Sequence, residues 1–148
     1  MRNILVAEGR INVRTNVMLR DRNGNLSEVD VACGFSSPPW SWVVPTRTMY
    51  IECKEYAASN PVSLDAVAKF KEVLILNNIP AHRGLVVTTS RFSPRATTIG
   101  VPTMNGEQLK VWEKAALASK SRRKGAAACI LFALSAVSAA EIYVRSQK

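Results

Sequence analysis

Residues 46–89 constrain the fold of this chain most strongly, because their hydrophobic pattern changes period twice. Residues 46–56 are predicted to form a strand, and residues 63–78 repeat apolar side chains at the spacing of a helix with one face on a core. Ser63 is a suitable N-cap for that helix. Residues 84–89 form a continuous β-favouring run, typical of a strand buried on both faces. A strand, a helix and a second strand imply a crossover between parallel neighbours, so the pattern predicts an α/β domain.

A β-hairpin is predicted before this unit. Residues 11–19 are expected to be extended, and Asn23-Gly24 supplies the residue types of a tight turn. The returning strand carries four apolar residues, Leu26, Val29, Val31 and Cys33. Residues 1–10 are predicted to form a brief helix. This order places Asp30 and Glu52 on neighbouring strands.

The rest of the chain is expected to complete one domain. Ser93-Pro94 can start a short helix that Gly100 must end, and Asn105-Gly106 turns the chain into residues 109–112. A length of 148 residues with 47% apolar content is sufficient for a hydrophobic core. The three cysteines form no Cys-x-x-Cys pair and are accompanied by one histidine, which argues against a zinc site or a disulfide framework.

The positive charge of the chain is concentrated near its end. The formal net charge is +9, but residues 1–114 hold 14 basic against 10 acidic side chains, while residues 115–148 hold six against one. The excess over the first 114 residues is therefore modest. It suits a phosphate-bearing partner only weakly.

Residues 125–140 contain no charged side chain. If Glu141 lies at an interface, the apolar span reaches about 20 residues, the length that a bilayer-spanning helix needs. Basic flanks, including Lys120 to Lys124, fit a membrane anchor over residues 125–144. The alternative is an Ala-rich helix packed on protein, because a segment that is apolar on all faces must be buried somewhere.

The predicted central strands carry the residues of a metal-dependent hydrolase. Glu52 and Lys54 share one face of their strand because side chains alternate, and Asp30 on the paired strand can converge on them. Asp30, Glu52 and the backbone carbonyl of Cys53 would bind a hard cation, Mg²⁺ or Mn²⁺, through oxygen. Lys54 would stabilise the negative charge that develops during hydrolysis of a phosphodiester.

Each of these residues also has an ordinary structural explanation. Asp30 could face solvent or pair with an arginine, and Glu52 with Lys54 could form a surface ion pair worth under about 1 kcal/mol. The apolar residues around them weaken that explanation, because an unpaired acid on a central strand would be costly. Glu28 and Glu55 are minor substitutes as ligands.

Other candidate residues lie outside these strands. Arg91 and Arg95 follow the predicted buried strand and are suitable phosphate contacts in a nucleic acid. Trp40 and Trp42, in a loop with three prolines, could stack on bases or anchor the loop. His82 is more simply explained as a loop residue than as a catalytic base.

The order of these elements resembles the PD-(D/E)XK nuclease superfamily, in which an acidic residue on a hairpin strand precedes an acidic-X-Lys tripeptide, a helix and another strand. The matching residues are Asp30, Glu52-Cys53-Lys54 and the elements after them. Gly84 to Thr88, followed by Arg91-Phe92-Ser93, is most similar to the Mrr-type branch, which includes a mitochondrial respiratory-growth protein of fungi. The resemblance covers residues 10–112.

The resemblance implies a restriction-endonuclease-like domain with a mixed central sheet flanked by helices, which we place at residues 1–119. Residues 120–148 would form a basic hinge and a C-terminal hydrophobic helix. In the family a longer first helix carries a glutamate that can join the metal site, whereas this chain offers only the brief helix predicted at residues 1–10, with Glu8. The loop from Pro38 to Pro45 also lengthens the gap between Asp30 and Glu52.

The predicted function is metal-dependent cleavage of nucleic acid, DNA by expectation, by a nuclease tethered to a membrane. The tail is compatible with a mitochondrial membrane, which the resemblance also suggests. Cutting both strands of a duplex would favour a homodimer. One alternative is a non-catalytic subunit of this fold with a structural or assembly role in a membrane complex. Another is a module that binds nucleic acid without cutting it and needs no metal.

Overall fold

The computed structural model describes residues 1–35 and 47–121 of the chain. The elements are α1 Arg2–Glu8, β1 Ile11–Arg20, β2 Leu26–Gly34, β3 Thr48–Lys54, α2 Leu64–Leu76, η2 Ala81–Arg83, β4 Gly84–Thr88, η3 Ala96–Ile99, β5 Thr103–Met104 and a helix over residues 106–121. Over the described residues the strands form one mixed sheet of five strands in the order β1-β2-β3-β4-β5. The strands β1, β2 and β3 are antiparallel neighbours, whereas β3, β4 and β5 are parallel.

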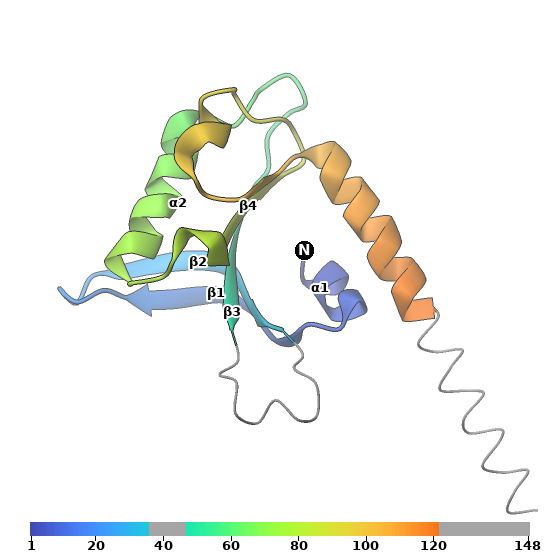
Figure 1. Ribbon diagram of the computed structural model, residues 1–148, viewed down its shortest axis with the longest axis horizontal. Coiled ribbons are helices and arrows are strands. Elements are labelled where there is room, and N and C mark those ends of the chain that lie inside the picture. The colour runs from blue at the N-terminus through green and yellow to red at the C-terminus, as the bar shows by residue number, and fades with distance from the viewer. Residues whose placement is uncertain (36–46, 122–148) are drawn as a thin grey trace, which may run out of the picture.

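The helices cover both faces of this sheet (Figure 1). The helix α2 lies on one face, and α1 lies on the other with the helix over residues 106–121 beside it. The structure therefore confirms the predicted α/β class, the hairpin and the parallel crossover from β3 through α2 to β4.

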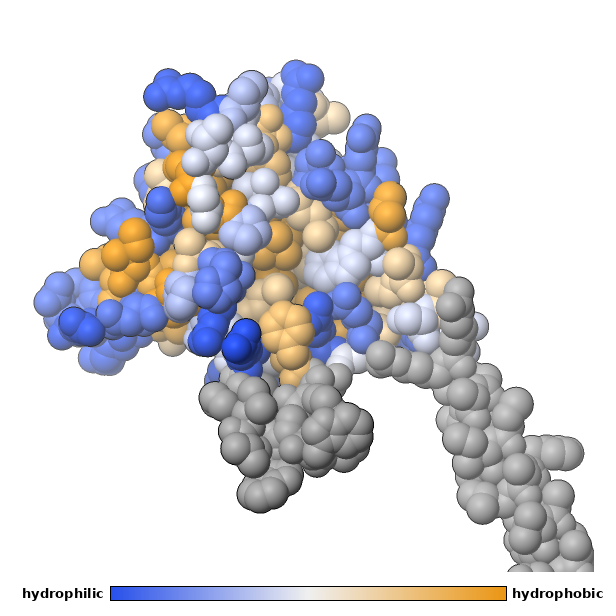
Figure 2. Space-filling model, in the orientation of Figure 1, coloured by the Kyte–Doolittle hydropathy of each residue, from blue (hydrophilic) through white to orange (hydrophobic). Residues whose placement is uncertain are grey.

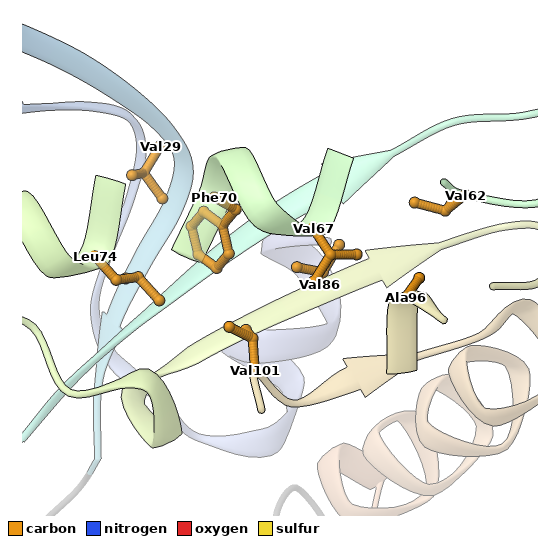
Figure 3. Close-up of a cluster of buried hydrophobic side chains, with 8 residues drawn as sticks. All are labelled: Val29, Val62, Val67, Phe70, Leu74, Val86, Ala96 and Val101. Carbon is orange, nitrogen blue, oxygen red and sulfur yellow. The ribbon is translucent and has the colours of Figure 1, made fainter. Parts of the chain in front are cut away.

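The sheet separates two buried clusters. The α2-side core contains Val29, Val62, Val67, Phe70, Leu74, Val86, Ala96 and Val101, and Figure 3 shows these side chains gathered beneath α2. The α1-side core contains Leu5, Val31, Cys33, Ile51 and Val87. Consecutive residues of β4, Val86 and Val87, enter different cores because side chains alternate along a strand.

The hairpin turn is held by the side chain of Asp21. Its Oδ1 accepts hydrogen bonds from the backbone N–H groups of Asn23 and Asn25, both at 2.8 Å, and its Oδ2 accepts from the Asn25 amide. Gly24 has a φ of 85°, which a residue with a side chain rarely adopts. The tip of the hairpin, at the left of Figure 2, is covered by hydrophilic side chains.

The helix α2 begins as its sequence predicts. The Ser63 hydroxyl accepts a hydrogen bond from the Ala66 N–H at 3.4 Å, which satisfies one of the otherwise unpaired donors of the first turn. Val67, Phe70 and Leu74 form its buried stripe. Beneath the helix, a Cβ added to Gly84 would overlap the side chain of Leu74, so this glycine allows α2 to lie close to β4.

The helix over residues 106–121 differs from the sequence prediction, which places a turn at Asn105-Gly106. In the structure Asn105 and Gln108 form a reciprocal capping box. The Asn105 side chain accepts from the Gln108 N–H, and the Gln108 side chain accepts from the Asn105 N–H, each at 2.9 Å. Ala116 is buried, and Leu109 and Trp112 are partly buried against α1.

The predicted hydrophobic helix at residues 125–144 lies outside the described part of the chain, as do Trp40 and Trp42. Within residues 1–35 and 47–121, no helix combines the length and the apolar character required to cross a bilayer. The division at residue 119 stays a prediction.

Candidate active site

Asp30 lies against β3, as the predicted pairing of the strands requires. Its Oδ2 accepts a hydrogen bond from the Cys53 N–H at 2.6 Å. The pair Val31↔Ile51 is the last residue pair in the β2–β3 ladder, and one step further along the same register Asp30 would face Glu52. The structure therefore brings Asp30 and the Glu52-Cys53-Lys54 segment together.

Glu52 and Lys54 project from the same face of β3. The Lys54 ammonium donates a hydrogen bond to Glu52 Oε1 at 2.7 Å. The side chains retain 31% exposure for Lys54 and 16% for Glu52, so this ion pair is partly buried rather than a pair on the open surface. Burial acts to lower the pKa of Lys54, but the hydrogen bond and charge of Glu52, together with the charge of Asp30, raise it overall. Lys54 is a cation at neutral pH.

A groove of about 380 Å³ runs between this end of β3 and the first turns of α2. Three candidates predicted from the sequence, Glu28, Glu52 and Lys54, line this groove together with Tyr56. Asp65 and Lys69 of α2 also line it and were not among the predicted candidates. Their four-residue spacing on one face was an available signal, but it is shared with many solvent-exposed helices.

The Cys53 side chain points away from the groove into the α1-side core, where it packs as a partly buried residue. Burial, followed by the charge of Asp30, raises the pKa of its thiol to about 11. The thiol is therefore neutral at physiological pH and unsuited to bind a metal, since the metal ligand is the thiolate. The backbone carbonyl of Cys53 stays the predicted ligand atom.

Arg91 lies on the loop that follows β4, next to the start of α2. Its carbonyl accepts a hydrogen bond from the Val62 N–H at 2.8 Å, and Val62 immediately precedes Ser63, which lines the groove. Arg95 directly precedes η3, and both arginine side chains are exposed. The fold thus brings the Arg91 backbone near the first turn of α2, where Ser63 lines the groove.

Two other candidates lie elsewhere. His82 is in η2 and lines a separate cavity with Phe35 and Met49, at the end of β3 opposite Lys54. Glu8 accepts hydrogen bonds from Trp112 Nε1 at 3.1 Å and from Arg10 Nε at 2.8 Å. The contact with Trp112 joins α1 to the helix over residues 106–121. Neither His82 nor Glu8 lines the groove.

The residues present fit a hard divalent cation. Among the residues that the structure describes, no group of three or more His, Cys, Asp or Glu side chains could hold a metal ion. Mg²⁺ does not require such a group, because it commonly keeps several waters and uses one or two carboxylates with substrate phosphate oxygens. Asp30 and Glu52 each use one carboxylate oxygen in the contacts above, which leaves the second oxygen of each as a hard ligand.

The fold of this chain is similar to that of solved structures. The chain matches a protein of unknown function, AF1548, with a TM-score of 0.54 and 17% identity, over 70% of this chain and 53% of that one. It thus spans about half the length of that protein, and the likeness supports the fold alone.

Two further structures match over larger shares of this chain. The DNA modification-dependent restriction endonuclease AspBHI has a TM-score of 0.44 and 17% identity, over 77% of this chain and 31% of that one. The MspJI restriction endonuclease in complex with a 27-mer oligonucleotide has a TM-score of 0.40 and 18% identity, over 82% and 25%. No curated protein matches the chain.

A family model described as restriction endonuclease, for the Mrr catalytic domain, matches residues 28–120. The match covers more than half of the chain and includes Asp30, Glu52, Lys54 and every element from β3 to residue 120 of the last described helix. The chain belongs to the Mrr-type restriction endonuclease family, within the PD-(D/E)XK nuclease superfamily.

Proposed function

We propose that this chain is a metal-dependent nuclease that hydrolyses phosphodiester bonds of DNA in the groove between β3 and α2. The observation that carries the proposal is that the Asp30 carboxylate contacts the Cys53 N–H, in the segment whose Glu52 and Lys54 side chains line that groove. Membership of the restriction endonuclease family supports DNA as the polymer.

In this proposal Asp30, Glu52 and the Cys53 carbonyl hold Mg²⁺ or Mn²⁺. The bound ion supplies Lewis acidity toward a phosphate oxygen and makes a bound water more acidic. Lys54 remains protonated at neutral pH and stabilises the negative charge on the phosphate as the bond to the leaving oxygen breaks. Its contact with Glu52 holds the ammonium at the groove before substrate arrives.

Three further cations would hold the DNA backbone. Lys69 lines the same groove from α2, so its ammonium can neutralise a phosphate beside the one that is cut. Arg91 and Arg95 are exposed on the loop after β4 and would contact phosphates further along the strand.

The proposal extends to the rest of the molecule on sequence grounds. Residues 1–119 form the nuclease domain, and residues 120–148 form a basic hinge followed by a membrane anchor at residues 125–144, with a mitochondrial membrane as the proposed location. A homodimer, alone or within a larger membrane complex, would cut both strands of a duplex. Carbonate extraction of a reporter fused to residues 115–148 tests the anchor, and release into the supernatant would contradict it.

Activity is tested with the full chain on supercoiled plasmid DNA in the presence of Mg²⁺. Asp30→Ala and Lys54→Ala should each abolish cutting. Lys110→Ala and Glu107→Ala are matched controls, because both residues are exposed on the helix over residues 106–121, away from the groove. Absence of cutting by the parent chain, with no Mg²⁺ binding in calorimetry, would instead support a non-catalytic member of the fold. Cutting of RNA but not DNA would show that the substrate is RNA.

A further inference from the structure

The alternation of side chains reverses midway along the β1–β2 hairpin. Val31 enters the α1-side core, whereas Val29, two residues earlier on the same strand, enters the α2-side core (Figure 3). On β1, Val13 packs against the α1-side core and Leu19 against the α2-side core. Residues separated by an even number should share one face of a regular strand. On both strands, the side chains at positions of equal parity therefore change from one face of the sheet to the other between these positions.

The reversal occurs where Asn16 faces Asp30. The pairs Thr15↔Val31 and Val17↔Val29 bracket this position with a constant register, so no residue is inserted here. Asn16 has a φ of 52°, in the left-handed region that asparagine tolerates better than most residues with a side chain. The left-handed conformation of Asn16 thus coincides with the change of face.

The reversal also affects how Asp30 meets β3, which pairs with β2 on the side opposite β1. If the antiparallel register continued beyond Val31↔Ile51, the Val29 backbone would face Cys53. Instead the Asp30 carboxylate accepts the Cys53 N–H at 2.6 Å, while Val29 turns into the α2-side core. The change of face and the placement of the carboxylate occur at the same residue.

We propose that Asn16 is a positioning residue for Asp30. Its left-handed conformation turns the hairpin over, and the turn sets the Asp30 carboxylate against β3 beside Glu52. The effect on DNA cleavage rests on the proposed function, but the effect on the Asp30 to Cys53 contact does not.

The test uses the full chain with substitutions that favour or oppose a positive φ. Asn16→Gly retains the conformation, whereas Asn16→Val opposes it, because a β-branched residue rarely adopts a positive φ. Asn12→Val is the matched control. Asn12 has the same φ of 52° on the same strand, but it lies at the register shift between Ile11 and Arg14, away from Asp30.

The first measurement is hydrogen exchange of the Cys53 amide by NMR. Asn16→Val should accelerate it about tenfold, as loss of a hydrogen bond to a carboxylate would. Asn16→Gly and Asn12→Val should leave it unchanged, and Asp30→Ala should reproduce the acceleration. Should Asn16→Val fail to fold by circular dichroism, Asn16→Ala provides a milder change in the same direction.

The second measurement is plasmid cleavage as a function of Mg²⁺ concentration. Asn16→Val should lower kcat by about a hundredfold, as a small displacement of a site residue does, and raise the Mg²⁺ concentration for half-maximal cutting. Asn16→Gly should restore both values. Unchanged Cys53 exchange in Asn16→Val, or equal acceleration in Asn12→Val, would overturn the proposal. A parent chain that never cuts DNA refutes the proposed function, while the exchange experiment still decides the role of Asn16.

Discussion

The Lys54 ammonium donates a hydrogen bond to Glu52 Oε1 at 2.7 Å, and both side chains line the groove between β3 and α2. This contact holds the proposed charge-stabilising cation beside a proposed metal ligand without substrate. It also links the site to the stability of the fold, because the pKa of Lys54 is raised in the folded chain.

The stability that this ion pair contributes should decrease at alkaline pH. Because the folded pKa of Lys54 lies above the ordinary lysine value of about 10.4, its contribution is fully present below that value. It is lost as the pH rises through the folded pKa. Lys54→Met should therefore cost under about 1 kcal/mol at pH 7, since the partly exposed pair is screened by solvent. Urea unfolding of both proteins from pH 7 to pH 11 should show the difference shrinking at the alkaline end, and a constant difference would contradict the assignment.

Glu52→Gln should weaken the binding of Mg²⁺ or Mn²⁺. The substitution keeps the shape of the side chain but removes the charge of a proposed hard ligand, and we expect a loss of at least about tenfold in affinity. Calorimetric titration measures it. Glu55→Gln serves as the control, because Glu55 is exposed and does not line the groove. Equal losses in the two variants would show that the ion is held by general surface charge.

Trp112→Phe should reduce the free energy of unfolding by about 1 kcal/mol, the typical net value of one hydrogen bond. Phenylalanine keeps an apolar ring against α1 but cannot donate to Glu8 Oε1. Urea unfolding followed by far-ultraviolet circular dichroism measures the change. Cleavage of plasmid DNA should be unaffected, since Glu8 and Trp112 do not line the groove. A selective loss of Mg²⁺-dependent cutting would instead indicate that Glu8 takes part in metal binding.

Cys53 should react slowly with iodoacetamide at pH 7.5. With its pKa raised to about 11 by burial, its thiolate fraction is lower by about two orders of magnitude than that of a free cysteine with a pKa of about 8.5. A Cys33→Ser, Cys129→Ser background isolates the Cys53 thiol for mass spectrometry. Cys53→Ala should leave Mg²⁺ affinity unchanged, because the proposed ligand is the backbone carbonyl. A fast reaction at neutral pH would contradict the burial of the thiol.

Several elements followed from local sequence. The Asn23-Gly24 turn, the apolar stripe of α2 with its Ser63 cap, and the continuous apolar run of β4 each depend on preferences within a few residues. Their order was enough to place Asp30 and Glu52 on neighbouring strands and to identify the family.

The start of the last described helix could not be predicted from local sequence. Asn105-Gly106 is compatible both with a tight turn and with a helix start, and the reciprocal hydrogen bonds between Asn105 and Gln108 selected the second. Packing of Trp112 and Ala116 against α1 stabilises that choice. This contact joins parts of the chain about a hundred residues apart, as the Glu8 to Trp112 hydrogen bond illustrates.

The sequence by itself determined the order of β1 to β4, the face shared by Glu52 and Lys54, and the family, because periodicity and turn chemistry act over short distances. The short strand β5 was not predicted. Only the tertiary structure decided that Asp65 and Lys69 complete the wall of the groove, that Glu8 is held by Trp112, and that Asp30 accepts the Cys53 N–H. The reason is physical. A strand pattern predicts alternation, but the left-handed Asn16 reverses it, and that reversal is visible only when both cores are in place.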